Sequence, residues 1–157
     1  MTQPKYYWED FVPGEPHTFG AYAITKEEII EFAREYDPQP IHLDEEAAKN
    51  SITGGLCASG WQSCAIVMRM MCDEYLLNSS SMAGFGIDEA KWRIPVRPGD
   101  ILSVTREVLS SRTLKSRPDA GLVLFRHTAA NQHGEVKVII EGKVMFGRRH
   151  PDTGGEA

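Results

Sequence analysis

Residues 59–75 read SGWQSCAIVMRMMCDEY, and this stretch decides how the chain folds. Apolar side chains recur at helical spacing over almost all of it, and Met68, Met70 and Met71 are expected to fill a core. The only polar stripe is Gln62, Arg69 and Asp73. A helix that is apolar nearly all round is surrounded by protein. The stretch therefore predicts a central helix from Ser59 or Gly60 to about Tyr75.

The second half of the chain changes to a period of two. Apolar and polar residues alternate over 102–108 and 136–146, as in strands with one buried face. Turn signals rich in Pro, Gly, Asn and Asp separate the runs at 95–100, 118–121 and 131–134. Strands joined by such short turns are antiparallel neighbours. The expected fold class is α+β, with one buried helix against one curved antiparallel sheet.

Composition excludes several classes of protein. The 157 residues suit one domain, and 41% hydrophobic with 25% charged residues is ordinary for a globular protein. A net charge of −5 argues against nucleic-acid binding. We expect no signal peptide and no membrane span, because no apolar run is long and uninterrupted enough. Three cysteines without CxxC spacing suggest reduced thiols, hence a cytoplasmic protein without a metal site.

A shorter helix precedes the central one. Thr25 and Glu28 fit a capping box, and apolar residues then recur at helical spacing. This helix is expected to end near Asp37, because a residue that precedes proline is pushed out of the α region. Asp44 is expected to cap a further short helix at about 45–50.

Between these two helices lies the stretch YDPQPIHLD, residues 36–44. It places Asp37 and His42 five residues apart with two prolines between them, and we expect it to be neither helix nor strand. One interpretation is a turn that caps the next helix. The other is an acid and a base that the prolines hold at a fixed separation.

The same stretch is similar to the hydratase motif Asp-x-Asn-Pro-x-His-x-Asp of the MaoC-like dehydratases and (R)-specific enoyl-CoA hydratases. Residues 54–61, GGLCASGW, resemble the start of that family's central helix, and residues 92–100 resemble its strand-turn pattern ending in Pro-Gly-Asp. The resemblance covers about residues 20–147. It implies a hot-dog fold, in which a curved antiparallel sheet wraps around one long apolar helix. We expect one such domain over 1–157, with an N-terminal arm (1–20) and a flexible tail (150–157).

The resemblance also implies roles for three residues. Asp37 and His42 match the catalytic pair, and Gly60 matches the glycine whose backbone N–H faces the thioester carbonyl. Gln39 stands where the family usually has Asn, which puts the fine geometry of the loop in question. The implied reaction is reversible hydration of a trans-2-enoyl thioester to the (R)-3-hydroxyacyl thioester. A coenzyme A thioester is then the substrate, no cofactor is needed, and a homodimer or dimer of dimers is expected.

The chemistry of the residues agrees with this reading. An aspartate and a histidine that share one water can activate it for attack, and a helix N-terminus at Gly60 can stabilise the enolate oxygen. Lys91, Arg93 and Arg97 could meet the phosphates of coenzyme A, or be solvated strand residues. Two alternatives stay open: a hot-dog acyl-CoA thioesterase, and a non-catalytic acyl-CoA-binding module.

Overall fold

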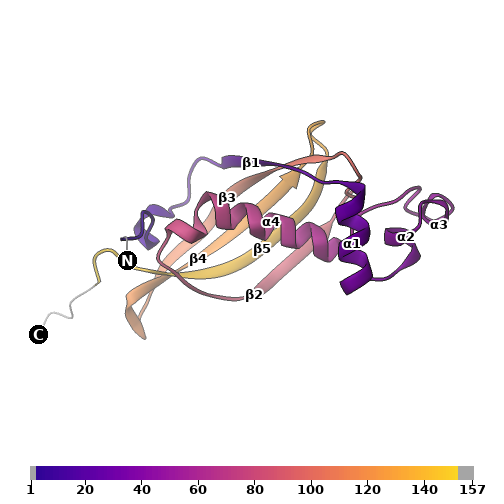
Figure 1. The fold of residues 1–157 in the computed structure, drawn as a ribbon. Coiled ribbons are helices and arrows are strands. Elements are labelled where there is room, and N and C mark those ends of the chain that lie inside the picture. Colours follow the sequence, from indigo (N-terminus) through magenta and orange to yellow (C-terminus); the bar gives the residue numbers. More distant parts are fainter. Residues whose placement is uncertain (1–2, 152–157) are drawn as a thin grey trace, which may run out of the picture.

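The computed structural model describes residues 3–151 (Figure 1). The strands are β1 (His17–Ala23), β2 (Ser81–Trp92), β3 (Ile101–Leu114), β4 (Arg117–Ala130) and β5 (Val136–Gly147). The helices are α1 (Lys26–Tyr36), α2 (Pro40–Leu43), α3 (Glu45–Lys49) and α4 (Gly60–Glu74), with 3₁₀ turns at Trp8–Asp10 and Leu76–Asn78. The strands form one antiparallel sheet in the order β1-β3-β4-β5-β2.

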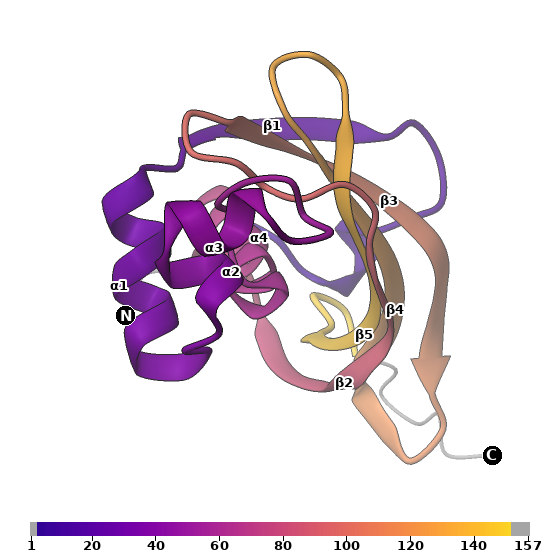
Figure 2. The same ribbon diagram turned by 90° about the vertical axis from the view of Figure 1, so that its right-hand side faces the viewer.

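The sheet curves around α4, which lies across its concave face (Figure 2). The helix buries Ile66, Val67, Met70 and Met71, while β3, β4 and β5 bury apolar residues such as Phe125 in the same core. The short helices α1, α2 and α3 gather at one end of the sheet, beside the start of α4 (Figure 1). The predicted α+β hot-dog fold is therefore confirmed.

The central helix begins and ends where the sequence predicts, but two expectations about its faces were wrong. Gln62 belongs to the predicted polar stripe and is nevertheless buried, where its side-chain amide donates to the Glu28 carbonyl of α1. Met68 was expected in the core and is 50% exposed, and Trp61 is 62% exposed. Within the described chain, one apolar side of α4 is thus left uncovered.

The capping box of α1 forms as predicted, with Glu28 N–H donating to Thr25 Oγ1 and Thr25 N–H donating to the Glu28 carboxylate. The expectation that residues 36–44 contain no helix was wrong. Pro40 opens the one-turn helix α2, because the first helical position needs no N–H donor. His42 therefore projects from a helical turn. Asp44 caps α3 as predicted, accepting from Ala47 N–H.

The predicted turn at 118–121 was also wrong. The β3–β4 hairpin turns at residues 115–116, and Arg117 already pairs with Leu114. The register then shifts, so that Thr113 pairs with Gly121 and the residues between lack partners on β3. Proline, which lacks an N–H, is tolerated at such a bulge. The predicted turn at 131–134 is confirmed by the hydrogen bond from Gly134 N–H to the Asn131 carbonyl.

The N-terminal segment packs onto the far end of the sheet. Phe11 is 1% exposed, with its ring centroid 4.4 Å from that of Phe146 and 5.4 Å from that of Phe125. Residues 17–20 of the expected arm belong to β1. Most of the expected tail, 150–157, lies outside the described residues, and the division of the chain into arm, domain and tail stays a prediction.

None of the described helices combines the length and hydrophobicity that crossing a membrane requires.

A buried polar pair lies inside the core. Tyr75 Oη and His127 Nε2 are 3.1 Å apart, with the two rings nearly parallel. Burial, helped by the charge of Arg106, lowers the pKa of His127 to about 3. His127 is therefore neutral in the folded protein across the range in which a solvated histidine takes up a proton.

This pair makes stability depend on pH. Between about pH 3 and 6.5 the unfolded chain binds a proton at His127 that the folded chain does not, so acid favours unfolding. We expect His127 to lower the free energy of unfolding by about 1.4 kcal/mol per pH unit as pH falls below 6.5. Urea unfolding of wild type and His127→Gln at pH 5, 6 and 7 measures this. The variant should show the shallower slope, and parallel slopes would contradict the assignment.

Candidate active site

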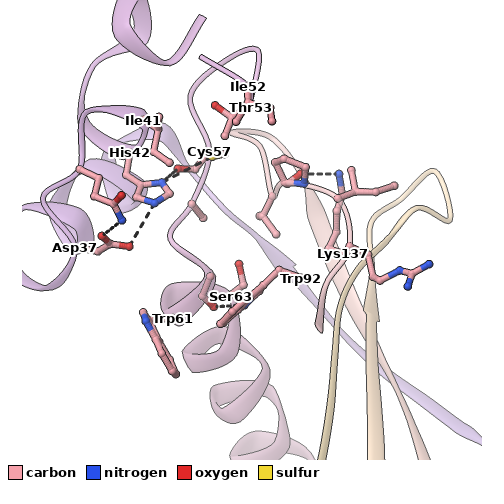
Figure 3. A pocket seen from close by; sticks show the side chains of 17 residues that line it. Asp37, Ile41, His42, Ile52, Thr53, Cys57, Trp61, Ser63, Trp92 and Lys137 are labelled. Atoms are coloured by element: carbon pink, nitrogen blue, oxygen red, sulfur yellow. Dashed lines mark hydrogen bonds and ion pairs between the residues drawn. The ribbon is translucent and has the colours of Figure 1, made fainter. Parts of the chain in front are cut away.

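Two short elements bring the acid and the base together. Asp37 follows the last residue of α1, and His42 lies in the single turn of α2. Asp37 Oδ2 and His42 Nε2 are 3.3 Å apart, and both side chains face the same cavity (Figure 3). The geometry therefore brings together the two side chains that the sequence singled out.

A backbone carbonyl fixes the orientation of the imidazole. His42 Nδ1 lies 2.7 Å from the Cys57 carbonyl oxygen, which can only accept a hydrogen bond. Nδ1 therefore holds a proton, and Nε2 is the nitrogen directed at Asp37. The ring is 6% exposed, so its position is set by these contacts and not by solvent.

The carboxylate of Asp37 is held from two directions. Ser59 Oγ donates to Oδ2 at 2.6 Å, and the amide of Gln39 donates to Oδ1 at 2.7 Å. These hydrogen bonds, led by the one from Ser59, lower the pKa of Asp37 against the opposing effect of burial, and the nearby His42 contributes least. The longer Gln39 thus reaches the carboxylate directly. Asp37 is a stable anion and a weak base.

Ser59 also joins the carboxylate to the start of α4. It is the N-cap residue, and its hydroxyl accepts a hydrogen bond from Trp61 N–H at 3.2 Å. The next residue, Gly60, offers a backbone N–H for which the described residues provide no acceptor. Free N–H groups and the partial positive charge of a helix N-terminus suit an oxygen that gains negative charge.

These groups border a cavity of about 480 Å³. Asp37 and His42 lie on one side of it, while Trp61 and Trp92 lie together on another (Figure 3). Most of the accessible lining is apolar, with a few polar groups converging on it. Such a composition is typical of sites that bind small molecules with an apolar portion.

Trp92 lies directly on the glycine at the helix start. Its indole Nε1 donates to the Gly60 carbonyl at 2.9 Å, and its ring is in edge contact with that of Trp61. A Cβ built on Gly60 would come within 2.5 Å of Trp92 Cε2. Only glycine fits under the indole in this position.

Gly60→Ala is therefore expected to lower the free energy of unfolding by about 1–3 kcal/mol, because the methyl group overpacks against Trp92. Chemical denaturation measures this. In a Trp92→Ala background the same substitution should cost little, which a double-mutant cycle reveals as a coupling energy. Equal costs in both backgrounds would show that the indole is not what excludes a side chain at position 60.

A buried ion pair supports the wall of the cavity opposite the helices. Lys137 is 2% exposed and lies 3.2 Å from the Asp100 carboxylate. Burial raises the pKa of Asp100, but hydrogen bonds from Arg97 N–H, Asn131 and Lys137 outweigh it and lower the pKa overall. Lys137 also donates to the Pro95 carbonyl. The ion pair thus holds the 95–100 turn against the sheet.

The candidate phosphate-binding cations have different environments. Arg97 is half-buried, and its guanidinium donates to the carbonyls of Thr53, Gly55 and Leu56. It therefore anchors the loop whose Cys57 carbonyl orients His42, and is not available to a phosphate. Lys91 pairs with Glu89 at 2.8 Å, while Arg93 is exposed and lines the cavity. Of the three, Arg93 is placed to meet a ligand.

Sequence reasoning missed three residues of the site. Ser59 was considered only as a possible first residue of the central helix, although serine just before a predicted helix is a signal for an N-cap. Trp92 meets Gly60 only because of the sheet register of β2, and no local pattern in the sequence indicated this contact. Cys57 lies beside His42, with Sγ 3.8 Å from Nδ1, but burial raises the pKa of its thiol and so disfavours a nucleophile.

The described residues contain no cluster of three or more His, Cys, Asp or Glu side chains suited to holding a metal ion.

Comparison with known proteins places this site in a family. Residues 10–131 match the model of the MaoC like domain. An uncharacterized protein of Bacillus subtilis, YdeM, is 32% identical over 136 residues, which cover 87% of this chain and 94% of the relative.

Solved structures of similar proteins point to the same family. The MaoC-like dehydratase of Rhodospirillum rubrum superposes with a TM-score of 0.86 at 41% identity, over 92% of this chain and 98% of that one. The (R)-hydratase PhaJ1 of Pseudomonas aeruginosa shares the fold at 22% identity, with a TM-score of 0.73 over 94% of this chain and 89% of that one. The family match extends over α1, the Asp37–His42 pair and most of the sheet. The chain therefore belongs to the MaoC-like domain family.

Proposed function

We propose that this protein reversibly hydrates a trans-2-enoyl thioester, presented as an acyl-CoA, to the (R)-3-hydroxyacyl thioester. The observation that supports it is the meeting of Asp37 and His42 at 3.3 Å on a cavity that Gly60, whose N–H has no acceptor among the described residues, also lines. The similar dehydratase of R. rubrum and the fold shared with an (R)-hydratase support the same reaction class.

In the proposed mechanism one water lies on the cavity side of the pair, within hydrogen-bond reach of both Asp37 Oδ2 and His42 Nε2. His42 Nε2 takes a proton from it as the water oxygen adds to Cβ of the enoyl group. The lowered pKa of Asp37 makes this carboxylate a poor base, so its role is to stabilise the imidazolium that forms 3.3 Å away. The Cys57 carbonyl keeps the other nitrogen protonated throughout.

The electrons of the double bond move toward the carbonyl, so negative charge develops on the thioester oxygen. Gly60 N–H, at the positive end of α4, donates to that oxygen. The enolate then collapses, and Cα takes the proton from His42. The oxygen and both hydrogens of water end on the product, so the reaction needs no oxidant, reductant or cofactor.

Two alternatives fit the site less well. A thioesterase must direct water at the carbonyl carbon, and the similar structures are a dehydratase and an (R)-hydratase. A binding module has no need of a buried imidazole whose tautomer and carboxylate partner are both fixed.

Turnover of crotonyl-CoA tests the proposal. Ultraviolet absorbance follows the loss of the conjugated double bond, and a thiol reagent detects free coenzyme A in the same reaction. We expect absorbance to fall without release of thiol, and the product to be the (R) enantiomer. Thiol release would indicate a thioesterase, and saturable binding without turnover of crotonyl-CoA or longer enoyl-CoAs would indicate a binding module.

The uncovered apolar surface supports a homodimer. Met82, Phe85 and Ile87 on the edge strand β2 are exposed, and so are Trp61 and Met68 of α4; Met68 and Ile87 line the same small cavity. An exposed apolar edge strand invites pairing with a second strand. We expect light scattering to give at least twice the 17.5 kDa chain mass, and Phe85→Asp to give the monomer. A monomeric wild type would rule out this arrangement.

A further inference from the structure

A second, smaller cavity of about 130 Å³ lies further along the groove between α4 and the strands β2 and β5, which also line the site cavity. On α4, the site cavity is lined by Gly60, Trp61 and Ser63, and the second cavity by Cys64, Val67, Met68 and Met71. On β5 the corresponding order is Lys137, then Ile140 to Val144. Both elements therefore present the two cavities in line, one after the other.

The edge strand β2 shows the same order in reverse, as antiparallel pairing with β5 requires. Trp92, at its end, lines the site cavity, while Gly84, Gly86 and Ile87 line the second cavity. Trp92 pairs with Val138, between the β5 residues of the two cavities. Its side chain is thus located at the boundary.

Contacts of the indole place it across the groove. It hydrogen-bonds to the Gly60 carbonyl and lies on the Gly60 backbone, which lines the site cavity. It also forms a hydrogen bond with Cys64, the first α4 residue of the second cavity, and this bond lowers the pKa of the thiol against the larger effect of burial. One side chain therefore contacts the first α4 residue of each cavity, Gly60 and Cys64, which lie one helical turn apart.

The second cavity is suited to an alkyl chain. Apart from His127 and Lys143, its lining consists of aliphatic side chains, methionines, Cys64 and glycine backbone. The accessible lining is almost entirely apolar, and such a surface favours methylene groups over water. It contains neither of the catalytic side chains, so it can extend an acyl site but cannot replace it.

We propose that Trp92 determines acyl-chain length: its indole separates the site cavity from the apolar second cavity and restricts the enzyme to short enoyl thioesters. This inference rests on the proposed hydratase function and deepens it. The restriction is a matter of the volume that the ring occupies at the boundary between the two cavities. Removing the ring joins the two cavities into one channel along α4.

The test compares kcat/KM for crotonyl-CoA and trans-2-octenoyl-CoA in three proteins. Wild type should prefer crotonyl-CoA. Trp92→Ala should shift the octenoyl-to-crotonyl ratio by about tenfold or more toward octenoyl, since each methylene accommodated in an apolar pocket contributes roughly tenfold or more. Trp92→Phe, which keeps most of the ring volume but loses the N–H, should leave the ratio close to that of wild type.

A variant in which an aromatic ring closes the second cavity from a different position provides the decisive control. In the double variant Trp92→Ala/Cys64→Phe a new ring fills the mouth of the second cavity, and the preference should return to crotonyl-CoA. A Trp92→Ala ratio equal to that of wild type would overturn the proposal, as would a wild type that already prefers octenoyl-CoA. If wild type turns over neither thioester, the hydratase function itself fails, and that result is distinct from an unchanged ratio.

Discussion

Asp37→Asn is expected to lower kcat/KM for crotonyl-CoA by about 10²–10⁴-fold, and His42→Ala by a similar factor. The amide cannot stabilise the imidazolium that forms when His42 takes the proton from water. It also presents Ser59 and Gln39 with a neutral group where each now donates to an anion. Steady-state kinetics measure the loss, and circular dichroism verifies that each variant is folded.

Asp44→Asn is the matched control for Asp37→Asn. It makes the same chemical change seven positions along the motif, and asparagine still caps α3. This variant should keep wild-type kcat/KM. A loss equal to that of Asp37→Asn would mean that the charge of the motif matters and not the pair. Full activity in Asp37→Asn would remove the carboxylate from the mechanism.

Lys137→Met is expected to have the largest effect on stability, lowering the free energy of unfolding by about 3–5 kcal/mol. The Asp100 carboxylate is nearly inaccessible to solvent, and the substitution removes its only cationic partner among the described residues. The 95–100 turn also loses the donor to the Pro95 carbonyl. Denaturant unfolding at neutral pH measures the change.

Lys143→Met on the same strand serves as its control. Lys143 pairs with Asp88 at 2.6 Å, but both side chains are about half exposed. Exposed pairs contribute about 0–1 kcal/mol, so the same substitution should have little effect here. Similar losses in both variants would mean that β5 needs lysine side chains for a reason other than the buried pair.

Local signals in the sequence predicted much of this molecule. The capping box at Thr25, the limits of α4 and the spacing of Asp37 and His42 all depend on residues within a few positions of one another. Proline stiffness predicts that the acid and the base stay close, whichever backbone conformation links them. The error at α2 arose because proline was treated only as a helix breaker, although it suits the first helical position.

Contacts between distant parts of the chain could not be predicted in this way. Ser59 is 22 residues from Asp37, and Trp92 is 32 residues from Gly60. Each pair meets only because the start of α4 is fixed against α1 and β2. β2 itself gave no alternating pattern, since Gly84 and Gly86 interrupt it and its residues are mostly exposed.

The fit of the Trp92 indole over Gly60 limits the order in which substitutions at these two positions can occur in evolution. Any side chain at position 60 collides with the indole, and a smaller residue at position 92 leaves the glycine without its neighbour. Position 60 can therefore change only after position 92 has changed to a smaller residue. A homologue with a smaller residue at position 92 would accept longer substrates and would also tolerate a side chain at position 60. The change in substrate range would therefore precede the change at the helix start.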